Sequence, residues 1–190
     1  MRKLLVLVFS FVALALSACS TTPPSNPNNL CSVFQEKDSW YVAAHKVRKK
    51  YNVPINVATA ILYEDSNFFS TKKDNESWFF FIPYSKDSQS SDQTISLYWD
   101  NYLEEEGNFF SSEDNFEDAL DFIGWYIAKT SQYNNIDYND AYNQYLNYHE
   151  GWQNYKIKTY LEKIWLLEKA NNVKQRSDEF KEQLLKCELY

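Results

Sequence analysis

Glycine, histidine and cysteine are scarce in this chain of 190 residues, which has three glycines, two histidines and three cysteines. Three scattered glycines cannot supply a glycine-rich loop that cradles a phosphate group. The two histidines, His45 and His149, form no Cys/His spacing typical of a metal site. The glycine-flanked serine of hydrolases is also missing from the sequence. We therefore expect no metal and no cofactor.

Basic residues are in the minority, with 19 Lys and Arg against 26 Asp and Glu, a net charge of −7. Removal of residues 1–18 takes away two basic residues and no acidic one, which leaves 17 against 26, or −9. No basic patch is visible in the sequence. A chain this acidic is a poor partner for nucleic acid, and we expect none.

The one long apolar run lies at the N-terminus. Leu4 to Leu16 is apolar apart from Ser10, and Arg2 and Lys3 precede it. A basic start followed by a short apolar run is typical of a secretory signal, and the run is too short for a stable membrane span.

The residues that follow, "LSAC" at positions 16–19, resemble a bacterial lipobox, in which the cysteine becomes the lipidated first residue of the mature chain. Ser20 after Cys19 resembles the outer-membrane sorting pattern. We expect residues 1–18 to be a signal peptide and Cys19 to anchor the protein in the outer membrane, facing the periplasm. The alternative is an ordinary signal peptide with an incidental cysteine.

Residues 19–36 begin with a Ser/Thr/Pro/Asn stretch that lacks charge and periodicity, and they predict a flexible tether. Residues 37–190 are long enough for one domain with its own core. Cys31 and Cys187 are the two cysteines left for that part of the chain. An exported protein can form disulfides, so we expect a Cys31–Cys187 bond, with two free buried thiols as the alternative.

Apolar residues recur at helical spacing through most of the domain, and no run has a convincing period of two. The fold class expected from this pattern is all-α. A capping box is expected at 111–114, a loop or short hairpin at 69–91, and close helix packing at Gly124. The expected helices cover about 39–51, 54–65, 95–106, 116–127, 139–148 and 159–185.

Aromatic residues make up 18% of the chain, and 15 of them are tyrosines. A small core cannot easily provide partners for so many phenol hydroxyls. Some of these rings are therefore expected to line a groove, and aromatic faces with polar tips suit a sugar polymer.

Three segments resemble the soluble lytic transglycosylases, a goose-type lysozyme-like family that acts on the bacterial wall. "YNVPINVATAILYEDSNF" (51–68) is similar to the catalytic helix of that family. "DFIGWY" (121–126) and "AYNQYLNYHEG" (141–151) are similar to later segments of its small lipoprotein members. The resemblance covers about residues 30–170 and implies a lysozyme-like helical domain.

In that family one glutamate protonates the oxygen of the MurNAc–GlcNAc link and then acts as a base while an anhydro ring closes. The resemblance places Asp65 at this position, with a side chain one methylene shorter. Glu64 is long enough, but neighbouring helix positions differ by about 100°, so it should point elsewhere. Glu64 and Glu150 are the alternatives to Asp65.

The resemblance also implies substrate-binding roles for Ser66, Gln93, Tyr126 and Tyr148. A family segment with glycine and glutamine is "SSDQ" here (90–93), so Gln93 is kept and the glycine is not.

These departures predict a degenerate domain with little or no lytic activity. The expected function is to bind peptidoglycan glycan strands or to serve in an envelope-spanning, secretion-type assembly with other envelope proteins. The alternative is an active peptidoglycan lytic transglycosylase that cleaves MurNAc–GlcNAc links.

Overall fold

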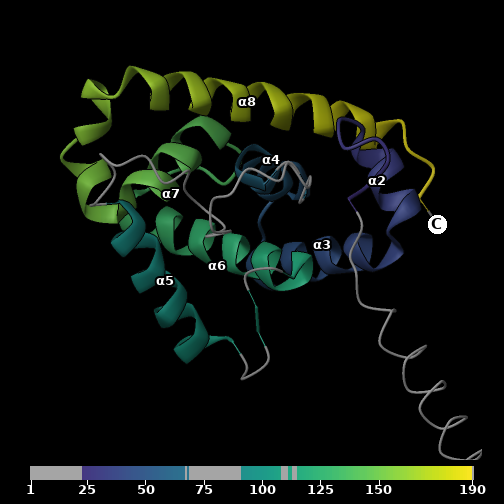
Figure 1. The fold of residues 1–190 in the computed structure, drawn as a ribbon, viewed down its shortest axis with the longest axis horizontal. Helices are drawn as coiled ribbons and strands as arrows, with labels where there is room; N and C mark the ends of the chain where they lie inside the picture. The colour runs from purple at the N-terminus through teal and green to yellow at the C-terminus, as the bar shows by residue number, and fades with distance from the viewer. Residues whose placement is uncertain (1–22, 67, 69–90, 108–110, 113–114, 190) are drawn as a thin grey trace, which may run out of the picture.

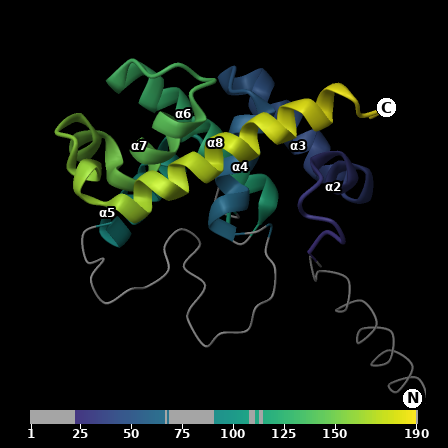
Figure 2. The ribbon, with the colours of Figure 1, turned by 90° about the horizontal axis from the view of Figure 1, so that it is seen from above.

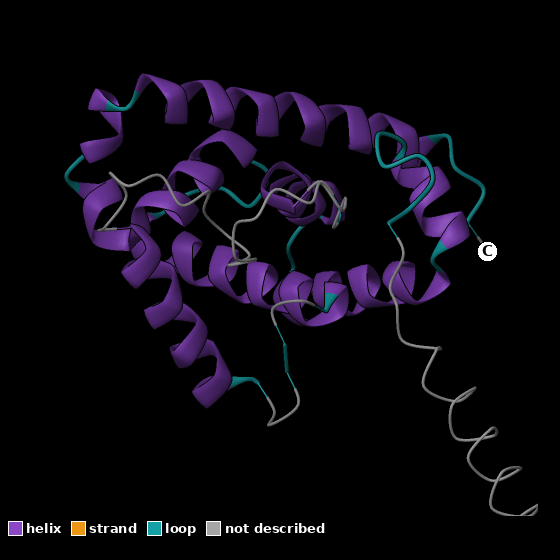
Figure 3. Ribbon diagram, in the orientation of Figure 1, coloured by secondary structure: helices purple, strands orange, loops and turns teal. Residues whose placement is uncertain are grey.

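The computed structural model describes residues 23–66, 68, 91–107, 111–112 and 115–189, with only the backbone at 91–96. Every regular element in these ranges is helical, which confirms the all-α prediction (Figure 3). The elements are α2 (Leu30–Glu36), α3 (Asp38–Tyr51), α4 (Ile55–Ser66), α5 (Ser91–Glu105), α6 (Phe116–Asn134), α7 (Ala141–Lys156), the 3-10 helix η1 (Thr159–Glu162) and α8 (Ile164–Leu185). None of the helices in the described ranges is both long and apolar enough to cross a membrane.

Helix α4 lies at the centre of the domain. In Figure 1 it is seen nearly end-on, between α8 on one side and α3 with α6 on the other. Figure 2 shows α8 running across the whole domain, from the α7 end to α2. Val57, Ala60, Ile61 and Leu62 of α4 have no exposed surface. A helix that is apolar on most of its circumference is stable only when it is buried, and α4 is surrounded by α3, α6, α7 and α8.

The break between α3 and α4 follows directly from the sequence "NVP". Asn52 takes a left-handed conformation (φ 58°) after the last residue of α3, and asparagine tolerates this conformation better than most residues. Pro54 then stands just before α4, and its carbonyl accepts hydrogen bonds from the N–H groups of Val57 and Ala58 at 3.1 and 3.2 Å. These two predicted helices are confirmed.

Gly124 lies where α6 crosses α3, as expected from its position in a strongly helical stretch. A Cβ at this position would overlap Val47 Cγ1 and lie 2.9 Å from Tyr51 Cδ2. The predicted capping box at 111–114 is wrong, because α6 starts at Phe116. Asn115 caps it, accepting hydrogen bonds from the N–H groups of residues 117 and 118.

The second half of the chain is divided differently from the prediction. Helix α7 continues past the expected end to Lys156, with a break in helical geometry at Gly151 (φ 78°, ψ 161°). The expected final helix is split into η1 and α8, and α5 begins four residues earlier than expected. Most of the loop or hairpin predicted for 69–91 lies outside the described residues.

The predicted tether at 19–36 is wrong in its second half. Leu30, Val33 and Phe34 of α2 are at most 1% exposed, and they belong to the main core. Asn29 caps this helix by accepting a hydrogen bond from Ser32 N at 3.0 Å. Pro24 is also buried. The folded domain therefore begins at least as early as Pro24.

The two ends of the described chain are joined. Cys31 of α2 and Cys187, just after α8, form a disulfide with their Cα atoms 5.7 Å apart. Gln183 of α8 adds two hydrogen bonds to the same region, accepting from Leu30 N at 2.7 Å and donating to Asn28 O at 3.1 Å. Both ends of the domain are thus held against the C-terminal part of α8.

Candidate functional site

Asp65 lies in the last turn of α4 and faces α7. The hydroxyl of Tyr145 donates a hydrogen bond to Asp65 Oδ1 at 3.1 Å, and the other oxygen, Oδ2, is buried. Tyr148 is three residues further along α7, so its ring lies on the same face of the helix. The Tyr145 and Tyr148 ring centroids are 6.4 Å apart, and both phenols interact with the Asp65 carboxyl. Tyr145 and Tyr148 are buried, and Asp65 is half-buried with its Oδ2 atom inside, so one carboxyl and two phenols form a largely buried polar group.

The pKa of Asp65 is raised to about 7, chiefly because burial disfavours the charged form. Lys169 of α8 and the Tyr145 hydrogen bond oppose this effect, and neighbouring Glu64 adds to it. A carboxyl with this pKa is about half protonated near neutral pH. A general acid needs this property, since it must hold a proton and be able to release it.

Glu64 is turned toward α8, as the 100° step between neighbouring helix positions predicts. Lys169, Asn172 and Arg176 of α8 interact with it. Burial raises its pKa, and these three neighbours partly oppose the rise. Arg176 also lies over the Tyr63 ring at 4.3 Å from the centroid, which helps to fix this side of α4 against α8. Asp65 and Glu64 therefore serve different faces of α4.

The prediction that Glu150 is an alternative to Asp65 as the proton donor is wrong. Its side chain is fully buried, with Lys163 Nζ at 2.6 Å, and Thr159 Oγ1 donates a second hydrogen bond. Burial alone would raise its pKa, but His149, Lys163 and Thr159 together lower the pKa to about 2. Glu150 is thus ionised at neutral pH and joins α7 to η1 next to the break at Gly151.

Two of the four predicted substrate-binding residues have structural roles. Tyr126 is 1% exposed, and its hydroxyl donates to Asn147 O at 3.0 Å, so it is a core residue. The Ser66 hydroxyl donates to Leu62 O at 2.5 Å, within its own helix. Tyr148 is 1% exposed and contacts the Asp65 carboxyl, so its ring packs beside this carboxyl instead of lining an open groove.

The fourth predicted residue, Gln93, is in α5, but its side chain lies outside the described residues. Sequence reasoning missed Tyr145, although it could have been found. Tyr145 and Tyr148 are three residues apart in "YNQYLNYHEG", a spacing that puts both rings on one helix face. No group of three or more His, Cys, Asp or Glu that could hold a metal ion is found in the described part of the chain.

Replacing Asp65 by asparagine is expected to stabilise the domain at pH 8 but hardly at pH 4. The Asp65 pKa is about 7 in the folded state and about 3.9 in an unfolded chain. Between these values the folded state binds more protons, so wild-type stability falls as the pH rises from about 4 to about 7. The difference of about three pKa units is equivalent to at most about 4 kcal/mol. Asparagine has no such proton, so Asp65→Asn should gain a few kcal/mol at pH 8.

Glu150→Gln is the control, and its expected effect on folding stability at pH 8 has the opposite sign to that of Asp65→Asn. The lowered Glu150 pKa stabilises the folded state above the unfolded value near 4.5, and this contribution is lost as the pH falls through about 2. This variant should therefore be less stable than wild type at pH 8. Urea unfolding midpoints at pH 4, 6 and 8 measure both effects, and a pH-independent effect of Asp65→Asn would contradict the raised pKa.

Comparison with protein-family models matches residues 6–187 of this chain to the transglycosylase SLT domain. No curated protein and no solved structure matches the chain. The matched region contains Asp65 and both tyrosines that contact it, and it covers nearly the whole sequence. The chain therefore belongs to the transglycosylase SLT domain family, and its function is the peptidoglycan-related one of lytic-transglycosylase-like domains.

Proposed function

We propose that this protein is a lipoprotein of the outer membrane, facing the periplasm, whose domain slowly cleaves peptidoglycan glycan strands with Asp65 as the acid. The observation that carries the proposal is the Asp65 carboxyl itself. It is held by Tyr145 and Tyr148 at the end of a buried helix, with a pKa of about 7. A buried carboxyl costs stability when it ionises, and such perturbed groups concentrate at functional sites.

In the proposed reaction the protonated Asp65 gives its proton to the oxygen that links MurNAc to GlcNAc, and the bond from MurNAc C1 to that oxygen breaks. The ionised Asp65 then takes the proton of the MurNAc 6-hydroxyl, whose oxygen bonds to C1. The products are an anhydro-MurNAc end and a free GlcNAc hydroxyl. No water is consumed, and Asp65 ends protonated, as it began.

Two features predict that the reaction is slow. The aspartate carboxyl is set back by roughly 1 Å relative to a glutamate, and a misplacement of this size can cost about a hundredfold in rate. In addition, Asp65 Oδ2 has no exposed surface in the structure. A sugar oxygen must reach this carboxyl before it can accept the proton.

The same burial favours a second candidate function, in which the domain binds glycan strands or takes part in an envelope-spanning assembly without cleaving. In that case the carboxyl and the phenols of Tyr145 and Tyr148 would join α4 to α7 as a structural contact. Other envelope proteins would then be the principal partners.

A turbidity assay on purified sacculi separates the two functions. We expect the mature wild-type chain to clear the suspension slowly and Asp65→Asn, which has nearly the same shape, to leave it unchanged. Both proteins should sediment with the sacculi to the same extent. Equal clearing by both proteins would show that Asp65 is not the acid of the reaction. Sedimentation of the wild-type chain with the sacculi, without clearing, would favour the second function.

The anchor is tested by Cys19→Ser. This variant lacks the thiol that the proposed lipidation uses, so it should appear in the soluble periplasmic fraction, whereas wild type stays with the outer membrane. Five Cα–Cα steps separate Cys19 from the buried Pro24. These steps can span at most about 18 Å, so the anchored domain would lie close to the membrane. Metabolic labelling with palmitate should mark wild type alone, and equal labelling of Cys19→Ser would contradict the proposed site.

A further inference from the structure

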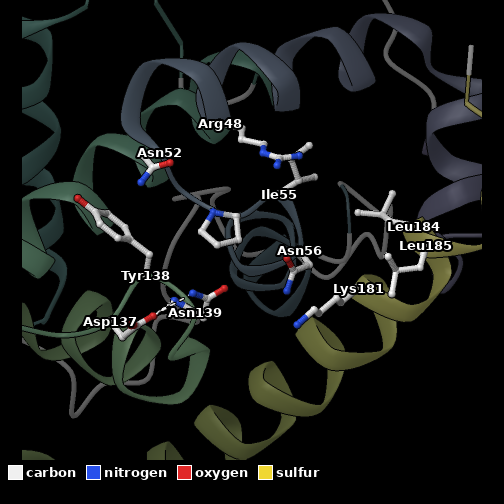
Figure 4. A pocket seen from close by; sticks show the side chains of 11 residues that line it. Arg48, Asn52, Ile55, Asn56, Asp137, Tyr138, Asn139, Lys181, Leu184 and Leu185 are labelled. Carbon is white, nitrogen blue, oxygen red and sulfur yellow. Dashed lines mark hydrogen bonds between the residues drawn. The ribbon is translucent and has the colours of Figure 1, made fainter.

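An open surface cavity of about 560 Å³ lies at the opposite end of α4 from Asp65. Most of its lining residues are exposed to solvent, among them Arg48, Asp137 and Lys181. Figure 4 shows the side chains that line it around Ile55 and Asn56 in the first turn of α4. The walls come from the end of α3, the segment between α6 and α7, and the last turns of α8. A cavity of this volume falls within the range of small-ligand sites, roughly 300–1,000 Å³.

Hydrogen bonds hold the walls in place without a ligand. Asn56 Nδ2 donates to Ser177 Oγ at 2.9 Å and to the carbonyl of the same residue at 3.2 Å, which ties α4 to α8. Gln144 Nε2 of α7 donates to Asp137 O at 3.1 Å. Asp137 Oδ1 in turn accepts from Asn139 N at 2.7 Å and Asn139 Nδ2 at 3.0 Å. The cavity is therefore preformed.

Charges of both signs line this cavity. Arg48 of α3 and Lys181 of α8 supply two cations, and neither has an ion-pair partner within the described ranges. Asp137 supplies one anion, because its hydrogen bonds from Asn139 lower its pKa. Amide groups of Asn52, Asn56 and Asn139 also line the cavity (Figure 4). Such a lining suits a ligand with carboxylates, an amine and peptide groups.

We propose that this cavity binds the stem peptide of peptidoglycan, a short peptide with free carboxylates and a diamino acid. Arg48 and Lys181 would take the carboxylates, and Asp137 the side-chain amine. The Asn52 amide would meet both donors and acceptors of the peptide backbone, and the side-chain oxygens of Asn56 and Asn139 would accept from its N–H groups, since Asn56 Nδ2 is already bonded to Ser177. This inference rests on the proposed function in one respect, namely that the domain acts on peptidoglycan. It does not require that Asp65 cleaves the glycan strand.

The position of the cavity gives the peptide site a role separate from cleavage. Ile55 and Asp65 are ten residues apart on α4, which corresponds to about 15 Å along the helix. A peptide held at the first turn of α4 would therefore not cover the acid at the last turn. It would keep the domain on the wall whether or not a glycan bond is being broken.

The test is isothermal titration of a synthetic L-Ala–D-Glu–diamino acid–D-Ala peptide into the mature chain. We expect the double variant Arg48→Gln with Lys181→Gln to bind at least tenfold more weakly than wild type. Lys49→Gln with Lys186→Gln is the matched control, since it removes one positive charge from α3 and one from the residue just after α8, and neither lysine lines the cavity. That control should bind like wild type.

Asp65→Asn distinguishes this inference from the proposed function. It should leave peptide affinity unchanged, because Asp65 is at the other end of α4. Peptide binding by a wild-type chain that does not clear sacculi would support the cavity site and count against cleavage. No binding to wild type, or equal weakening by the cavity variant and its control, would overturn the inference.

Discussion

Asp65→Glu is expected to cleave glycan strands about tenfold to a hundredfold faster than wild type. The added methylene returns the carboxyl to the reach of the glutamate at this position in lytic transglycosylases, and a displacement near 1 Å can change a rate by about a hundredfold. Tyr145 and Tyr148 would still face the carboxyl from α7. The rate of muropeptide release from sacculi at pH 7 is the measurement.

Two further variants test which of the neighbouring carboxyls, Asp65 or Glu64, is needed for cleavage. Asp65→Ala should release nothing above background, while its binding to sacculi stays the same. Glu64→Gln is the neighbouring control, and it should cleave at the wild-type rate because Glu64 faces α8. If Glu64→Gln abolished release and Asp65→Ala did not, the roles of the two carboxyls would be reversed.

Loss of the disulfide is expected to be the largest single change in stability. Cys31 and Cys187 are 156 residues apart in sequence, so the bond closes a very long loop in the unfolded chain. The chain-entropy model gives roughly 3–5 kcal/mol for loops of this order. The double variant Cys31→Ser with Cys187→Ser should therefore unfold roughly 10 °C below wild type.

Thiol labelling separates the bond itself from the substitutions. Under denaturing, non-reducing conditions the wild-type domain should show no free thiol at Cys31 or Cys187. Adding a reductant should lower the melting temperature of wild type and leave that of the double variant unchanged. Two labelled thiols in the untreated wild-type protein would contradict the disulfide.

Helices α3 and α4 could be predicted because their signals are local. Apolar spacing defined their buried faces, and the "NVP" break separated them. Gly124 was also informative, because a glycine within a strong helical pattern is costly unless another helix packs against it. Helix α2 could not be predicted. Its seven residues are too few to be stable alone, so it depends on burial of Leu30, Val33 and Phe34 against the core.

The candidate site was predictable only in part. The spacing of residues in a helix tells in which direction a side chain points, but it does not tell which groups from other helices surround that side chain. The different directions of Glu64 and Asp65 followed from helix geometry. The pairing of Glu150 with Lys163 depends on the break at Gly151, whose effect on the path of the chain could not be read from the sequence. The substrate-binding role of Tyr126 was taken from the family resemblance, and the structure instead buries its ring in the core.

The central claim is that Asp65 serves as both acid and base in glycan cleavage. The most direct test is mass spectrometry of the products that the mature wild-type chain releases from purified sacculi. We predict muropeptides with 1,6-anhydro-MurNAc ends, absent when Asp65→Asn is used. Products with ordinary reducing ends would mean that water is the nucleophile, and no release above the Asp65→Asn background would mean that the domain does not cleave; either result would contradict the account.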